Sequence, residues 1–118
     1  MKIKIPSRLK IGGHYVSIFY EDKLMDNHGK YGQSRFAECE IALQDRDMAE
    51  SSKVQSLLHE ILHFIDRAYN NCNMDEATID AVATGLHAML VDMEIEIDLS
   101  EIRSIKGNNK DKTYASEV

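Results

Sequence analysis

Hydrophobic and polar residues alternate along much of the first half of the chain, and this period of two predicts β-strands. Residues 2–5 and 36–44 alternate in this way, and the second run predicts a strand with one buried face. Gly12 and Gly13 separate two further alternating runs. Because glycine adopts a positive φ at low steric cost, this pair predicts a tight hairpin turn. The polar residues 21–35 predict a loop.

Helical periodicity replaces the alternation from about residue 50 onward. The apolar residues that share one arc of this first helix are Val54, Leu57, Leu58, Ile61, Phe64, Ile65 and Ala68. The opposite arc is polar and carries His59, His63 and Asp66. Residues 70–73 break this helix and precede a second one over residues 75–93, which Asn73 or Asp75 caps. The second helix is expected to bury Ile79, Val82, Leu86, Met89, Leu90 and Met93.

These elements predict one α+β domain over residues 1–106, in which a three- to four-stranded antiparallel sheet packs on the two helices. The 118 residues suit a single domain, and 43% apolar with 29% charged residues is an ordinary globular composition. Ser100 opens a short further helix that Gly107 ends, and residues 107–118 are expected to form a flexible tail.

The net charge of −6 is concentrated in the middle of the chain, where residues 31–99 carry four Lys or Arg against fourteen Asp or Glu. A field of this sign repels phosphate and attracts cations, which disfavours nucleic acid and favours a metal ion or a basic peptide as partner. The sequence has no membrane-length apolar run and no signal-peptide pattern, and Cys39 and Cys72 are too few for a disulfide scaffold. We therefore expect a soluble cytoplasmic protein without a membrane partner.

The strongest chemical signal is the HExxH motif at residues 59–63, which falls on the first helix. Four residues are about one helical turn, so His59 and His63 stand one above the other and can both reach one Zn²⁺ at about 2.0–2.1 Å. Glu60 projects from the flank of the same turn, where it can accept the proton of a metal-bound water. The motif therefore predicts a zinc site with Glu60 as general base.

A third protein ligand is needed, and the second helix offers two candidates. Asp66 and Tyr69 occupy the places where a metzincin would continue with Gly and with its third ligand, so that class is disfavoured. Glu76 and Asp80 lie one turn apart on the second helix. One of them can bind the metal while the other orients a ligand imidazole through its free N–H. We expect Glu76 to be the ligand and Asp80 to be the main rival.

The segments LLHEILHFIDRAYN and DEATIDAVATGLHAML resemble the small HExxH zinc metallopeptidases of phages and prophages, which are zincin-like relatives of gluzincins and ImmA/IrrE-type peptidases. The resemblance covers residues 31–93. It implies zinc at His59, His63 and Glu76, with Glu60 as general base. It also implies a small antiparallel sheet packed on an HExxH helix and a second helix that supplies an acidic ligand.

The expected function is therefore zinc-dependent hydrolysis of peptide bonds through a metal-activated water. The alternative is a non-catalytic, zinc-stabilised interaction module or an inactive peptidase relative; Glu60 argues against it, because a structural site needs no base. The expected partner is a peptide or protein substrate that adds to residues 36–44 as an edge strand. A phage or prophage origin would place the protein in the cytoplasm of a bacterial host.

Overall fold

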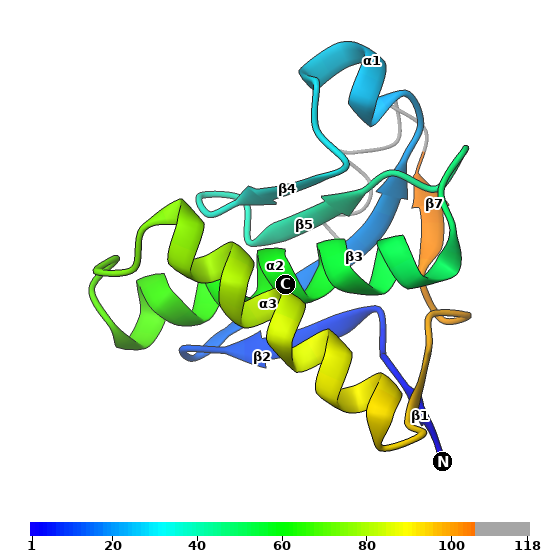
Figure 1. Ribbon diagram of the computed structural model, residues 1–118. Coiled ribbons are helices and arrows are strands. Elements are labelled where there is room, and N and C mark those ends of the chain that lie inside the picture. Colours follow the sequence, from blue (N-terminus) through cyan, green and yellow to red (C-terminus); the bar gives the residue numbers. More distant parts are fainter. Residues whose placement is uncertain (106–118) are drawn as a thin grey trace.

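The computed structural model describes residues 1–105 and confirms the expected α+β class (Figure 1). The expected tail, residues 107–118, lies outside the described residues. The helices are α1 (Leu24–His28), α2 (Glu50–Tyr69) and α3 (Glu76–Asp92). The strands are β1 (Lys2–Lys4), β2 (Arg8–Ile11), β3 (His14–Glu21), β4 (Gly32–Arg35), β5 (Glu40–Leu43), β6 (Glu96–Asp98) and β7 (Arg103–Ile105).

The main sheet is mixed, so the prediction of an antiparallel sheet was wrong. Its order is β2-β3-β5-β4, and β7 also pairs with β3. The β2–β3 and β4–β5 pairs are antiparallel, whereas β3 runs parallel to both β5 and β7. The physical reason is that β4 takes the outer position, so β5 returns between β4 and β3. A short separate sheet joins β1 to β6 in parallel.

The predicted hairpin is present at Gly12 and Gly13, whose φ angles are 60° and 84°. The register pairs Ile11 with His14, so the loop has only these two residues. A Cβ at Gly12 would lie 2.6 Å from the Cβ of Ala68. Glycine is therefore required here both by the turn and by the close approach of the turn to the end of α2.

The loop predicted over residues 21–35 was wrong, because this segment contains α1 and β4. Leu24 of α1 is fully buried and packs with Phe19 and Ala42 on the side of the sheet away from α2. The predicted strand over residues 36–44 shortens to β5, since Cys39 adopts a φ of 55°. All four residues of β5 are buried, because β5 is an inner strand between β3 and β4 and both faces of the sheet are covered there, which corrects the expected single buried face.

Both long helices were predicted correctly, and they form successive layers on the sheet. Val54, Leu57 and Phe64 of α2 join the core residues of β3 and β5. The third layer is α3, which packs on α2 (Figure 1). Asp75 caps α3, since its Oδ1 accepts the Thr78 backbone N–H at 2.8 Å.

Because α3 is an outer layer, part of the prediction of its buried residues was wrong. Ile79 and Ala83 are buried, but Val82, Met89 and Met93 are exposed because only one side of α3 faces α2. The helix expected from Ser100 was also wrong. The chain instead forms β7, preceded by Leu99 and Ile102, which enter the main core. Among residues 1–105, no helix combines the length and the apolar character that crossing a membrane requires.

Candidate metal centre

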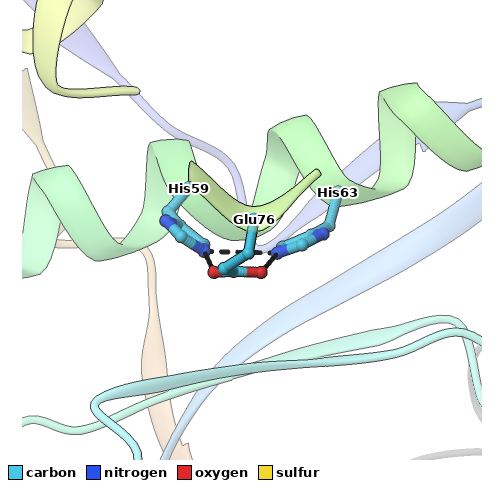
Figure 2. Close-up of side chains that lie close together, drawn as sticks. All are labelled: His59, His63 and Glu76. Atoms are coloured by element: carbon cyan, nitrogen blue, oxygen red, sulfur yellow. Dashed lines mark hydrogen bonds and ion pairs between the residues drawn. The ribbon is translucent and has the colours of Figure 1, made fainter. Parts of the chain in front are cut away.

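The two histidines of the HExxH motif face one another from successive turns of α2, as the spacing predicts. Their Nε2 atoms are 3.2 Å apart (Figure 2). The side chains of His59 and His63 are 17% and 24% exposed. They were expected on the polar, open face of the helix, but they are only partly exposed, and Glu76 and Asp80 of α3 contact them.

The connection between α2 and α3 determines where the third candidate ligand lies. Asp66 is only 5% exposed, which corrects its expected place on the polar arc. Its Oδ1 accepts hydrogen bonds from the Asn70 side chain at 2.9 Å and from the Met74 backbone N–H at 3.2 Å. Asn71 and Cys72 adopt positive φ angles in the same turn. These constraints reverse the chain and bring the first turn of α3 against the motif.

Glu76 reaches both histidines from this first turn. Its Oε1 lies 2.6 Å from His59 Nε2, and its Oε2 lies 3.0 Å from His63 Nε2 (Figure 2). One ligand atom from each of the three residues lies within 4.8 Å of the others. Bonds of about 2.0–2.1 Å in tetrahedral geometry separate the ligand atoms of zinc by about 3.3 Å. The three side chains can therefore hold such an ion with small adjustments.

Asp80 contacts the remote nitrogen of the first histidine, since its Oδ1 lies 3.4 Å from His59 Nδ1. This contact favours the tautomer with the proton on Nδ1, which leaves the Nε2 lone pair facing Glu76. A lone pair that faces a carboxylate oxygen is unfavourable unless a cation or a proton lies between them. Of the two rivals, Glu76 is thus the one that faces both Nε2 atoms, while Asp80 is placed to orient the His59 ring.

Glu60 leaves the same helical turn on its other flank and points toward β4. It is 8% exposed, and its Oε1 accepts a hydrogen bond from the Ser34 hydroxyl at 2.7 Å. A Cβ built on Gly32 would lie 3.1 Å from Glu60 Oε2. Glu60 therefore sits beside the histidines with its carboxylate held against the sheet.

The two histidines and the Glu60, Glu76 and Asp80 carboxylates line one cleft of about 530 Å³ between α2, α3 and the segment that contains β4. The lining residues are Lys30, Tyr31, Gly32, Gln33, Ser34, Phe36, Gln55, Ser56, His59, Glu60, His63, Glu76 and Asp80. This set contains three carboxylates and one lysine, so the cleft attracts cations. The acidic middle of the sequence is thus gathered in part around the two histidines.

The sequence patterns missed the contribution of β4 to the cleft. Gly32 and Ser34 lie in the segment that was predicted to be a loop, and the hydrogen bond of Ser34 to Glu60, 26 residues away, leaves no local periodic signal. Tyr69, at the C-terminal end of α2, does not line the cleft. Its hydroxyl instead accepts the Gly12 backbone N–H at 2.9 Å.

Comparisons with known proteins add no relative to this picture. No protein-family model, no curated protein and no solved structure matches the chain. The geometry of the cleft is therefore the observation from which a function can be argued.

Proposed function

We propose that the protein is a zinc-dependent metallopeptidase in which His59, His63 and Glu76 bind the metal and Glu60 is the general base. One observation carries the proposal: two imidazole nitrogens and a carboxylate converge within 4.8 Å in the cleft that also contains the buried Glu60. The resemblance of the motif segments to small phage-type metallopeptidases points to the same chemistry.

The chemistry of the three donors suits a catalytic zinc site better than a structural one. Imidazole nitrogen and carboxylate oxygen are common zinc ligands, and three of them leave the fourth position open to water or substrate. Structural zinc sites are usually closed by four protein ligands. Glu76 is 68% exposed at the side of an open cleft, which supports access by a substrate.

In the proposed reaction, Glu60 moves the proton. A bound zinc ion supplies an acidified water and polarises the scissile carbonyl. Glu60 accepts the proton from the attacking water and returns it to the leaving amine. Asp80 holds the His59 ring through Nδ1, so that Nε2 stays aimed at the metal position.

An extended substrate can bind along β4. Residues 36–44 were expected to supply the edge strand, but β5 lies between β3 and β4 and has no free edge. The edge strand next to β5 is β4, and residues of β4 line the cleft. We infer that a peptide added to β4 would pass the histidines with its backbone presented for hydrolysis.

The test is the Glu60→Gln variant, measured with a mixture of internally quenched fluorogenic peptides of randomised sequence. Glutamine retains the size of the side chain and an oxygen for the Ser34 hydroxyl but cannot take up a proton. We expect unchanged zinc content and a loss of hydrolysis of about 10²–10⁴-fold. Glu101→Gln, an exposed residue outside the cleft, serves as the control and should match the wild type.

Three results would contradict the proposal in different ways. Full activity of Glu60→Gln would remove Glu60 as the base, and loss of zinc in this variant would make it a ligand. A wild-type protein that binds zinc but hydrolyses none of the peptides would favour the zinc-stabilised interaction module.

A further inference from the structure

Two residues of β4 lie beside the Glu60 side chain, on the same face of the strand. Ser34 donates its hydroxyl hydrogen to Glu60 Oε1 at 2.7 Å, and its Oγ also lies 3.2 Å from the Glu60 backbone oxygen. Gly32 lies against the rest of the side chain, where a Cβ would be 3.1 Å from both Cγ and Oε2. Residues i and i+2 of a strand share a face, so Gly32 and Ser34 both lie on the side of β4 that faces Glu60.

The strand that makes these contacts is itself firmly held. Gly32 pairs with Leu43 and Ser34 pairs with Ile41, and both partners are fully buried. The next residue, Arg35, donates to Glu21 Oε2 at 2.8 Å, and Glu21 is also buried. The hydroxyl of Ser34 is therefore presented from a fixed backbone rather than from a loop.

We propose that Ser34 and Gly32 are positioning residues for Glu60, an inference that rests on the proposed role of Glu60 as general base. Ser34 occupies Oε1, which leaves Oε2 as the oxygen that accepts the proton. Gly32 provides the space that Oε2 occupies, since any larger residue would push the carboxylate by a few tenths of an ångström.

Glu60 needs such positioning because a glutamate side chain rotates about several bonds and its carboxylate can otherwise occupy many positions. Proton transfer needs the base within about 2.6–3.2 Å of the proton donor. A misplacement of about 1 Å can reduce a rate by about 10²-fold. A carboxylate held at one oxygen and confined at the other keeps this distance without rearrangement during the reaction.

The first test compares Ser34→Ala with Ser34→Thr, which restores a hydroxyl. The control is Ser17→Ala, a partly buried serine of β3 that does not line the cleft. With zinc-loaded protein and the randomised fluorogenic peptides, we expect kcat of Ser34→Ala to fall about 10–100-fold, with KM changed by less than about threefold. Ser34→Thr should recover most of the loss, and Ser17→Ala should match the wild type.

The second variant tests the space at Gly32. The φ angle of Gly32 is not in the left-handed region, so Gly32→Ala introduces no backbone strain of that kind. The effect of the substitution therefore comes from the contact of the new Cβ with Glu60. We expect kcat to fall about tenfold or more at unchanged zinc content. Gly85→Ala is the matched control, since nothing lies within 4 Å of a Cβ at this helical position.

A readout on the metal-free protein separates this inference from the proposed function. The side-chain carboxyl ¹³C resonance of Glu60 should shift in Ser34→Ala, return toward the wild-type position in Ser34→Thr, and stay unchanged in Ser17→Ala. If the wild type hydrolyses no peptide, the peptidase proposal fails, and this resonance alone decides whether Ser34 holds the carboxylate. An unshifted resonance, or an unchanged kcat of Ser34→Ala in an active enzyme, overturns the inference.

Discussion

The assignment of Glu76 and Asp80 makes a quantitative prediction about thermal stability in zinc. Glu76 faces both Nε2 atoms at 2.6 and 3.0 Å, whereas Asp80 reaches only the remote His59 Nδ1 at 3.4 Å. On the proposed assignment, Glu76→Ala removes a zinc ligand, and Asp80→Asn removes the anion that orients the His59 ring. Asp92→Ala, an exposed acid at the far end of α3, leaves the site intact and serves as the control.

The expected shifts follow from linkage between zinc binding and folding. Free zinc at 100 times the wild-type Kd stabilises the folded state by about 2.7 kcal/mol, or about 11 °C in Tm at about 4 °C per kcal/mol. A tenfold weaker site in Asp80→Asn leaves about 1.4 kcal/mol, or about 6 °C, at the same zinc concentration. A ligand loss that weakens binding about 100-fold leaves about 0.4 kcal/mol, or about 2 °C.

The assay is differential scanning calorimetry of each variant in chelator and at one buffered free zinc concentration. The zinc-induced rise in Tm removes any effect that a substitution has on the metal-free fold. We expect the largest rise in Tm for the wild type and Asp92→Ala, a smaller rise for Asp80→Asn and the smallest for Glu76→Ala. A smaller rise for Asp80→Asn than for Glu76→Ala would reverse the two roles, and no rise in the wild type would refute a zinc site.

Two further predictions concern the framework of the site. Arg35→Met removes the guanidinium from the buried Glu21 and Glu40 carboxylates and should cost about 3–5 kcal/mol in urea unfolding, against less than about 1 kcal/mol for Arg46→Met in its exposed pair with Asp22. Equal costs would contradict this. Hydrogen bonds from the side chain and backbone of Thr78 hold the pKa of Asp75 below its ordinary value of 3.8. Its stabilising effect is therefore present above pH 3.8 and is lost as the pH falls through the lowered pKa. The difference in unfolding free energy between wild type and Asp75→Ala should shrink between pH 6 and acid, and a constant difference would contradict it.

The helices could be predicted from the sequence because their signals are local. The apolar arc of α2 repeats every three to four residues, and Asp75 stands directly before α3 as a capping residue. The parallel pairing of β3 with β5 depends instead on the position of β4 in the sheet. The alternation of apolar and polar residues predicts a strand but does not predict its neighbours. The exposed Val82 and Met89 show the same limit, since helical spacing does not reveal that α3 is an outer layer.

The residues of the candidate site also differ in whether a local sequence signal predicts them. His59 and His63 lie four residues apart on one helix, so their meeting follows from helix geometry alone. The place of Glu76 beside the histidines could be predicted because the short break after α2 favours a second helix that packs back along α2. Ser34 could not be predicted, because its contact with Glu60 depends on the order of strands in the sheet.

The placement of the candidate ligands on two helices gives the site a structural consequence of its own. His59 and His63 belong to α2, whereas Glu76 belongs to α3, whose buried residues are Ile79 and Ala83. An ion held by all three would join the first turn of α3 to the middle of α2. If zinc binds only when α3 is packed on α2, the coupling is reciprocal: zinc binding stabilises this packing by the same free energy by which the packing favours zinc binding. Metal binding and the packing of α3 on α2 would then be one coupled equilibrium, so Tm would report on the candidate ligand Glu76 although its side chain is 68% exposed.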